Sequence, residues 1–390
     1  MKHRKVFLFI ILALVLVMLF SLVAVEAAPG PVRVIVVFNK KSSGHERSAA
    51  VRGVGGHVIH DLNLVSAKAV ILPDAASTLS LAASPGVVRV EKDVQVSIVG
   101  PTGQAKSHGG STTQAAQVTP WGITKVNAPQ AWSTGTGSGV KVAVIDTGID
   151  LSHPDLQANI KGGYNAIRPN RSAKDDNGHG THVAGTIAAL NNSIGVVGVA
   201  PSTSLYAVKV LGANGSGWLS DVIEGIQWSA ANGMQVANMS LGSSSDSQAM
   251  HDAVIQAKAA GLTIIAAAGN VSGAPVIYPA AYAEVIAVSA TDQNNNLAYF
   301  SSYGPQVDLG DPGVNVYSTY KGGTYATLSG TSMATPHVTG SAALVIGSGL
   351  ATTPDQVKAR LEGTAVDLGP AGWDVYFGSG LVNDLAATTP

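Results

Sequence analysis

A serine, a histidine and an aspartate suggest the chemistry of this chain. Ser332 lies in the run Ser-Gly-Thr-Ser-Met-Ala-Thr-Pro-His that ends at His337, where small residues favour a tight turn. The residues from Met333 to Ile346 favour a helix, and Pro336 fits its first turn. A serine at the start of a helix is usually only an N-cap. The same place also brings backbone N–H groups and the positive end of the helix dipole to the hydroxyl, where they would stabilise an oxyanion.

His179 and Asp146 supply the two groups that a serine nucleophile needs. Asp146 ends an apolar run, and His179 stands in Asn-Gly-His-Gly-Thr-His just before a predicted helix. An imidazole can take the proton of a hydroxyl, and a carboxylate can orient that imidazole. Ala-Ala-Ala-Gly-Asn270 follows another apolar run and offers a side-chain amide as a second oxyanion donor beside the Ser332 N–H. Together these segments predict acyl transfer through Ser332.

A parallel sheet is the element that must position these residues. Apolar runs predict strands at 140–145, 205–211, 236–240, 262–268 and 285–290, and the segments between them predict helices at 182–190, 219–232 and 247–260. Strands joined by crossover helices form mainly parallel sheets that are covered on both faces. Active sites in such sheets form beyond the carboxyl ends of the strands. The sequence therefore predicts an α/β fold for the large unit over 117–390.

A smaller unit precedes the large one, over residues 28–99. Strands are predicted at 32–38, 58–64, 67–72 and 87–91, with helices at 42–54 and 74–84. This β-α-β-β-α-β order is the ferredoxin-like α+β arrangement. His57 and His60 lie at one of these strands without an acidic cluster beside them, and we interpret both as structural. Residues 100–116 are rich in Gly, Ser, Thr and Gln and are predicted to form a linker.

The first 27 residues have the pattern of a secretory signal peptide. Basic residues at 2–5 precede an apolar run over 6–25, and Val25-Glu-Ala27 offers small residues for cleavage. The apolar run is long, so an uncleaved membrane anchor is the alternative to a secreted protein. The chain has no cysteine, which excludes disulfides and cysteine-based zinc sites. Its net charge of −1 gives no indication of a nucleic-acid partner.

The motifs around these residues closely resemble the subtilisin family of serine proteases (the subtilases, family S8). The resemblance covers almost all of 117–387. It rests on Val-Ala-Val-Ile-Asp146-Thr-Gly, His179-Gly-Thr-His-Val-Ala-Gly, Leu190-Asn-Asn-Ser-Ile-Gly-Val-Val-Gly-Val-Ala-Pro201, Asn238-Met-Ser-Leu-Gly242 and Gly330-Thr-Ser332-Met-Ala-Thr-Pro-His. It implies a subtilisin-like three-layer fold and a monomeric endopeptidase that acts on proteins and peptides.

The roles that the resemblance implies are those of the subtilisin triad. Ser332 would be the nucleophile, His179 the general base and then the general acid, Asp146 the group that orients His179, and Asn270 the oxyanion donor. The small unit looks like an I9-type propeptide, which acts as an intramolecular chaperone and inhibitor. The linker is similar to that of archaeal pro-subtilisins. The implied protein is a secreted zymogen that processes itself, with cleavage after Val99.

Two glycine-containing segments are expected to bind the substrate as an extended strand. These segments are Gly215-Ser216-Gly217 and Ser240-Leu241-Gly242. Ile277, before Tyr278-Pro279, takes a pocket-floor position that is often Gly or Ser in the family. A branched side chain there predicts a shallow S1 pocket, with small or mid-sized aliphatic P1 residues preferred over Phe and Tyr. Cleavage after Val99 would agree with this preference.

Structural calcium is also implied by the resemblance. Six residues match the family's high-affinity site, namely Gln117, Asp155, Leu190, Asn192, Ile194 and Val196. Their carbonyl, amide and carboxylate oxygens suit Ca²⁺. One departure from the family is Asp311, which stands where an Ala usually precedes Pro-Gly. A carboxylate near the core at this position needs a partner that the sequence does not name.

Three other interpretations were weighed against a protease. A catalytically silent subtilase would keep the fold without activity, and labelling of Ser332 by a serine-directed phosphonate separates it from an active one. A nucleotide-binding protein is disfavoured because the Gly-rich run at 135–139 precedes its strand instead of following it. An α/β-hydrolase esterase is disfavoured because the Gly-x-Ser-x-Gly motif is missing and the order Asp, His, Ser is wrong for that fold.

Overall fold

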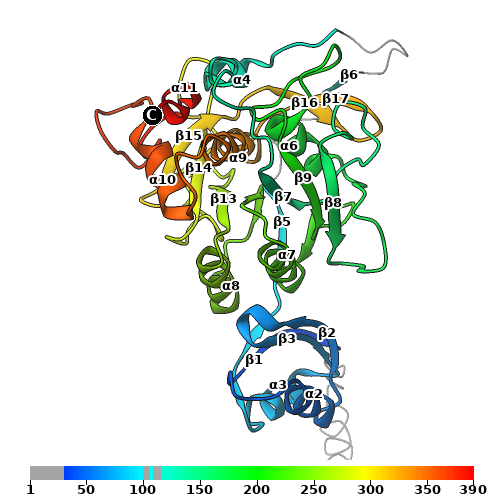
Figure 1. Ribbon diagram of the computed structural model, residues 1–390. Helices are drawn as coiled ribbons and strands as arrows, with labels where there is room; N and C mark the ends of the chain where they lie inside the picture. Colours follow the sequence, from blue (N-terminus) through cyan, green and yellow to red (C-terminus); the bar gives the residue numbers. More distant parts are fainter. Residues whose placement is uncertain (1–29, 100–105, 109–115) are drawn as a thin grey trace, which may run out of the picture.

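Figure 1 shows the chain as a computed structural model in which residues 30–99, 106–108 and 116–390 are described. The predicted signal peptide, residues 1–27, lies outside the described residues, and so does most of the predicted linker over 100–116. Among the described residues, no helix is both long enough and apolar enough to cross a membrane.

Seven strands form the central sheet of the large unit, in the order β15-β14-β13-β11-β7-β9-β8 (Figure 1). Each neighbouring pair is parallel. The strands are β7 (Lys141–Asp146), β8 (Ile160–Asn165), β9 (Ser204–Lys209), β11 (Val236–Met239), β13 (Thr263–Ala267), β14 (Ile286–Thr291) and β15 (Val307–Pro312). The predicted α/β fold with a mainly parallel sheet is confirmed. The strands β8 and β15 were not predicted, because glycines, Asp and Pro interrupt their apolar pattern.

Helices cover both faces of this sheet. The longer ones are α6 (His179–Ala188), α7 (Leu219–Ala231), α8 (Gln248–Ala259), α9 (Thr331–Gly347) and α10 (Pro354–Gly363); short ones are α4 (Trp121–Lys125), α5 (Ala128–Ala131) and α11 (Asp384–Thr388). Residues of β7 point alternately to the two faces. Val142 and Val144 pack in one core with α6 and α9, whereas Ala143 and Ile145 pack in the other with α7 and α8.

A small antiparallel sheet includes three residues of the predicted linker. The strands β16 (Val316–Tyr320) and β17 (Thr324–Leu328) form a hairpin, and β6 (Lys106–His108) pairs with β17. The stretch predicted to be a linker therefore contains a short strand. Periodicity could not identify it, because three residues at a sheet edge are too few to show a pattern.

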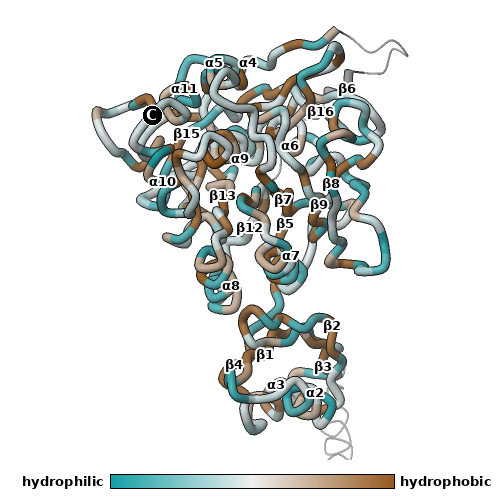
Figure 2. The backbone as a smooth tube through the Cα atoms, viewed as in Figure 1, coloured by the Kyte–Doolittle hydropathy of each residue, from teal (hydrophilic) through white to brown (hydrophobic). Residues whose placement is uncertain are grey.

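The small unit has the predicted β-α-β-β-α-β order. Its strands are β1 (Val32–Phe38), β2 (His57–Leu62), β3 (Ala67–Leu72) and β4 (Val87–Lys92), and its helices are α2 (Gly44–Gly53) and α3 (Ala75–Ala82), with a 3₁₀ turn at Asn63–Val65. The sheet order is β2-β3-β1-β4. Along β1, Val34 and Val36 face the two helices of this unit, whereas Ile35 and Val37 belong to the core that contains α7 and α8. The open face of the small sheet thus packs on the large unit, and Figure 2 shows this sheet next to α7 and α8.

Two carboxylates of the small unit lie at the N-termini of α7 and α8. Asp93 accepts hydrogen bonds from Ser220 N (2.9 Å) and Ser220 Oγ (2.7 Å) at the start of α7. Glu91 accepts from Ser247 Oγ (2.7 Å) and Ala249 N (3.2 Å) at the start of α8. The first N–H groups of a helix have no intrahelical partner, and the helix dipole favours negative charge there. These contacts fix the small unit over the two helices.

His60 differs from its prediction. Its Nε2 lies 2.7 Å from Asp221 Oδ1 on α7, and the two side chains are 7% and 6% exposed. The sequence did not reveal this partner, because Asp221 belongs to the other unit. The histidine is therefore part of the contact between the units, and not only of the small core.

Two aspartates are buried in the large unit and form no ion pair with another described residue. Asp311, in β15, and Asp384, the first residue of α11, are both fully buried. Among the described residues, no hydrogen bond to either carboxyl group meets the usual geometry. Burial, and secondarily the charge of Asp384, raises the pKa of Asp311 well above its usual range, with the Val382 N–H opposing this. Burial raises the pKa of Asp384 to about 7, against an opposing contact with Ser341.

We expect these two carboxyl groups to make the fold less stable at alkaline pH. A carboxyl group with a raised pKa binds its proton more tightly in the folded chain than in the unfolded chain. The stability that it contributes is complete below pH about 4 and is lost as the pH rises through 7. Asp384→Asn should therefore raise the unfolding free energy at pH 9 more than at pH 5.

The measurement is urea unfolding at both pH values in a Ser332→Ala background, which prevents self-digestion. One pKa unit corresponds to about 1.4 kcal/mol, so the gain should reach at least that size. Asp355→Asn, at a side chain that is 80% exposed, is the matched control. An equal effect of Asp384→Asn at the two pH values would contradict the expectation.

Candidate active site

The structure brings Asp146, His179 and Ser332 to the carboxyl edge of the sheet. Asp146 ends β7, His179 begins α6, and Ser332 is the second residue of α9. His179 Nδ1 lies 2.8 Å from Asp146 Oδ1 and 3.0 Å from Oδ2. All three residues are at most 2% exposed. Because both carboxylate oxygens can only accept, Nδ1 carries the proton and Nε2 is left with its lone pair.

The residues next to the triad explain why Asp146 and His179 meet. Thr147 N donates to Asp146 Oδ1 (2.7 Å), which turns the carboxylate toward the histidine. Asp175 accepts from the N–H groups of Asn177, Gly178 and Thr181 and so holds the loop that leads into α6. Gly178 has φ +116°, and a Cβ there would lie 2.3 Å from the Tyr320 ring. The loop can therefore pass between α6 and the hairpin only with glycine at this position.

Ser332 occupies a different place in its helix from the one predicted. α9 begins at Thr331, so Ser332 lies inside the first turn and Gly330 takes the N-cap position. Pro336 is correspondingly inside the helix and not in its first turn. Pro336 has no N–H to donate to the carbonyl of Ser332, four residues earlier. Ser240 Oγ donates to that carbonyl instead (2.9 Å), so the break in the helix ties Ser332 to the Ser240 segment.

The carbonyl oxygen of Val99, at the end of the small unit, lies against two residues of the candidate site, Ser332 and Asn270. Ser332 Oγ is 2.9 Å from this oxygen, and Asn270 Nδ2 donates to it at 3.1 Å. Asn270 Oδ1 accepts from Thr331 N (2.8 Å) and Oγ1 (2.9 Å), which aims the amide nitrogen at Val99.

Two hydrogen bonds expected at this site, one of the triad and one of the oxyanion hole, are not formed among the described residues. Among the described residues, His179 Nε2 has no hydrogen-bond partner, and the Ser332 N–H makes no bond to the Val99 oxygen. The Ser332 hydroxyl donates to the carbonyls of Val99 or Ser240 (3.0 Å) instead of to the histidine. Catalytic hydrogen bonds are often long or misaligned before the reactive complex forms, so the geometry is compatible with a Ser–His pair.

The expected substrate segments lie on both sides of the strand that precedes Val99. This strand, β5 (Gln95–Ile98), runs antiparallel between β10 (Ser216–Trp218) and β12 (Leu241–Gly242). Ile98 N also donates to Gly215 O (2.8 Å), and Val99 N points to Ser240 O at 3.5 Å. The residues brought together are Gly215, Ser216, Gly217, Ser240, Leu241 and Gly242. An extended segment of the chain's own small unit therefore fills the groove.

Ile277 lies beside two glycines near the end of this groove. A Cβ on Gly242 would be 2.5 Å from Ile277 Cδ1, and one on Gly269 would be 3.4 Å from Ile277 Cγ2. Ile277 N donates to Ala268 O (3.0 Å), which fixes the backbone. The branched side chain thus takes up space between the strand of Gly242 and the strand that leads to Asn270.

The six residues expected to bind calcium form one oxygen-rich cluster. Gln117 Nε2 lies 2.7 Å from Leu190 O and 3.3 Å from both Asn192 Oδ1 and Val196 O. The Ile194 N–H donates to Asn192 Oδ1 (2.7 Å). Three oxygens of the loop therefore converge on one side-chain amide, which can present its own oxygen to a cation by turning over.

Asp155 gives this cluster its negative charge. The residue is fully buried, and its carboxylate accepts from Asn192 Nδ2 (2.8 Å) and Val196 N (2.9 Å). Burial raises its pKa to about 6 against these hydrogen bonds. Among the described residues, no group of three or more His, Cys, Asp or Glu side chains could hold a metal, so a cation here would depend on neutral oxygens and one carboxylate. That donor set fits Ca²⁺.

Some residues around the site were not predicted from the sequence. Thr147 and Asp175 align the triad, and Lys209, the last residue of β9, donates to the carbonyl that follows Asp146. Asp175-Asp176, three residues before His179, is the one signal that could have identified part of this set. The strand β5 was also missed, because its pairing partners lie more than 100 residues away.

Comparison with known proteins agrees with this geometry. The profile of the subtilase family matches residues 137–380. The chain is 50% identical over 333 residues to an alkaline protease of Shouchella clausii, covering 85% of this chain and 81% of that protein. It is 57% identical over 274 residues to subtilisin Savinase of Lederbergia lenta, covering 70% of this chain and all of that protein.

A third relative extends along nearly the whole chain. Subtilisin J of Geobacillus stearothermophilus is 44% identical over 401 aligned residues, which cover 99% of this chain and all of that protein. These relatives are bacterial, so the similarity to archaeal pro-subtilisins and the I9-type propeptide stay predictions. The family match spans more than half of the chain and includes the segments of Asp146, His179 and Ser332. The chain belongs to the subtilase family and is a subtilisin-like serine endopeptidase.

Proposed function

We propose that this chain is the precursor of a secreted subtilisin that cleaves itself after Val99. The observation that supports the proposal is the Val99 carbonyl, held between Ser332 Oγ (2.9 Å) and Asn270 Nδ2 (3.1 Å). Residues 1–27 would be the signal peptide, 28–99 the propeptide, 100–116 the linker and 117–390 the catalytic domain. After export, the enzyme would hydrolyse proteins and peptides outside the cell as a monomer.

In the proposed reaction each of these side chains has one role. Ser332 Oγ attacks the carbonyl carbon of the residue before the cleaved bond, and His179 Nε2 takes the hydroxyl proton. Asp146 holds the Nδ1 proton and stabilises the imidazolium that forms. Asn270 donates to the oxyanion, a contribution known to be about 10²–10³ in kcat for the corresponding donor of subtilisin itself. His179 then protonates the leaving amine, and water hydrolyses the acyl-enzyme.

The propeptide would remain bound after cleavage and inhibit the enzyme. Its strand β5 pairs with both sides of the groove, and Asp93 and Glu91 contact the N-termini of α7 and α8. A peptide substrate needs the same backbone groups of β10 and β12. Substrate therefore cannot enter until the propeptide dissociates or is degraded.

Self-cleavage is tested by intact mass and N-terminal sequencing of the purified full chain. The wild type should be cut between Val99 and Gly100, and Ser332→Ala should stay whole, because the mutant lacks the nucleophile. Ser329→Ala, three residues before the nucleophile, is the matched control and should be processed normally. Equal cleavage of the wild type and Ser332→Ala would show that a host protease is responsible and would contradict the proposal.

Ile277 would set a preference for small or mid-sized aliphatic P1 residues. The support is its packing against Gly242 and Gly269, together with valine at the proposed cleavage site. Ile277→Gly should open the S1 pocket and raise kcat/KM for Phe and Tyr at P1 by about 10-fold relative to Val. Full burial of an aromatic side chain contributes about 1.5–3 kcal/mol.

A peptide library that varies only P1 measures this preference for wild type and mutant. Ile255→Gly is a control at a similar side chain, on the exposed side of α8. An unmodified enzyme that cleaves best after Phe or Tyr would contradict the proposed role of Ile277.

Calcium would bind at Gln117, Asp155, Leu190, Asn192, Ile194 and Val196 and stabilise the fold. The support is the convergence of three oxygens on Gln117 and the buried Asp155 carboxylate. Such an ion contributes stability by binding the folded state alone. It takes no part in the chemical steps above.

Chelation should lower the melting temperature of the Ser332→Ala protein by several degrees, and added calcium should restore it. Asp155→Asn should remove most of this calcium dependence, whereas Asp355→Asn, at an exposed carboxylate, should preserve it. The readout is the melting temperature with and without chelator, at a pH above 7 where Asp155 is ionised. A calcium response in Asp155→Asn equal to that of the parent would contradict the proposed site.

A further inference from the structure

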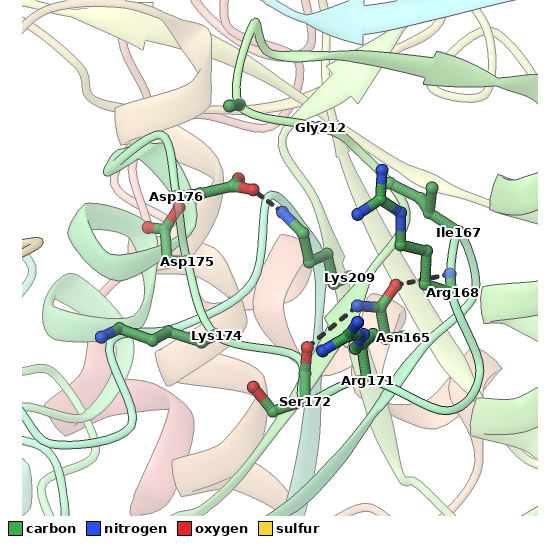
Figure 3. Close-up of a pocket in the computed structure, with 11 residues that line it drawn as sticks. Asn165, Ile167, Arg168, Arg171, Ser172, Lys174, Asp175, Asp176, Lys209 and Gly212 are labelled. Carbon is green, nitrogen blue, oxygen red and sulfur yellow. Dashed lines mark hydrogen bonds and ion pairs between the residues drawn. The ribbon is translucent and has the colours of Figure 1, made fainter.

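Lys209 is a buried lysine next to the catalytic aspartate. It is the last residue of β9, and in the parallel register of β7 and β9 it is the partner of Asp146. Its side chain is only 7% exposed. Figure 3 shows the ammonium group pointing to Asp176, at the wall of a cavity of about 660 Å³ next to the active site. A lysine is rarely buried to this degree unless its charge has partners.

The ammonium group of Lys209 has three acceptors, one for each proton. Nζ donates to Thr147 O at 2.6 Å, to Asp176 Oδ1 at 2.7 Å and to Leu211 O at 2.9 Å. These acceptors belong to three separate segments at the carboxyl edge of the sheet. One follows β7, one precedes α6, and one follows β9.

Two of these segments hold catalytic groups. Thr147 follows Asp146 and donates its N–H to the Asp146 carboxylate, and its Oγ1 accepts from Gly180 N at 2.9 Å. Asp176 is three residues before His179, in the loop held by Asp175. The third segment supports the same strand end, because Leu211 N donates to Asp146 O at 3.2 Å. One side chain thus links the two segments on either side of the Asp146–His179 hydrogen bond, through the Thr147 carbonyl and the Asp176 carboxylate.

We propose that Lys209 is a positioning residue for catalysis: its ammonium group fixes the Asp146–Thr147 end of β7 relative to the loop that carries His179. The inference rests on the proposed triad. The simpler alternative is that Lys209 only satisfies buried carbonyl groups and so contributes to stability. The two differ in their consequences, because a positioning residue affects the rate of the chemical step while leaving the binding groove on β10 and β12 intact.

Lys209→Met tests the proposal, since methionine keeps an unbranched chain but has no charge and no donor. We expect kcat to fall about 10- to 100-fold, because small displacements of catalytic groups lower kcat by factors of this size. KM should change less than about 3-fold, because no groove residue is altered. Asp176→Asn, which keeps an acceptor for Nζ, should stay within about 3-fold of the wild-type kcat.

The assay uses the full chain, and it follows both self-cleavage and steady-state hydrolysis of a peptide by the processed enzyme. Lys141→Met is the matched control, because Lys141 begins β7 at the opposite edge of the sheet. Circular dichroism in the near ultraviolet establishes that each variant is folded. If Lys209→Met does not fold, Lys209→Gln is judged by the same ratio of kcat to KM effects.

The outcomes separate this inference from the proposed function. A wild-type kcat in a folded Lys209→Met with only a lower melting temperature would overturn the positioning role. A Ser332→Ala chain that cleaves itself and peptides at the wild-type rate would overturn the triad and, with it, the role of Lys209. Loss of activity in Ser332→Ala, together with the expected kcat loss in Lys209→Met and normal activity in Lys141→Met, would support both.

Discussion

The position of the Val99 carbonyl group depends on contacts between the two units of this chain. It lies within hydrogen-bond distance of both Ser332 Oγ and Asn270 Nδ2, and the strand before it is paired on both edges. The strand alone would lose much conformational freedom on binding, whereas here it continues from a folded small unit that is docked on the large one. The contacts of Asp93 and Glu91 with α7 and α8 provide this docking. The same contacts that place the Val99 carbonyl at Ser332 thus also fill the groove between β10 and β12.

Buried charged groups of the large unit differ in how many hydrogen bonds they make. Around the triad each buried charge has several hydrogen bonds: Asp175 accepts from three backbone N–H groups, and Lys209 donates to three oxygens. Such networks are rigid because removal of one partner leaves another group unsatisfied. The Asp311 and Asp384 carboxyl groups lack comparable partners among the described residues. We expect these two groups to affect the stability of the fold and its dependence on pH, and not the chemical steps.

The sequence was sufficient for the parts of the fold that have strong periodic signals. The strands β7, β9, β11, β13 and β14 and the helices α6, α7 and α8 were all predicted, because each is an apolar run or has a helical pattern of adequate length. The small unit was predicted in the same way. The strands β8 and β15 could not be predicted, since Gly-Gly in one and Asp and Pro in the other obscure the pattern.

The candidate site was predicted in part. Motif residues such as Asp146, His179, Ser332 and Asn270 could be named because their chemistry is visible in the residue type. The residues that hold them could not, since Lys209 resembles any polar residue at a strand end until the sheet is assembled. The place of Pro336 inside α9 was also missed, because the hydroxyl that compensates for its missing N–H belongs to Ser240, 92 residues before Ser332.

The central claim, that Ser332 is the nucleophile and that the propeptide end covers it, is tested most directly by labelling with a serine-directed phosphonate. Ser332 should be modified slowly while the propeptide is bound, and rapidly once the propeptide has been removed, with the label located by peptide mass mapping. Equal rates in the two states would contradict the occupied groove. A label on a residue other than Ser332 would contradict the assignment of the nucleophile.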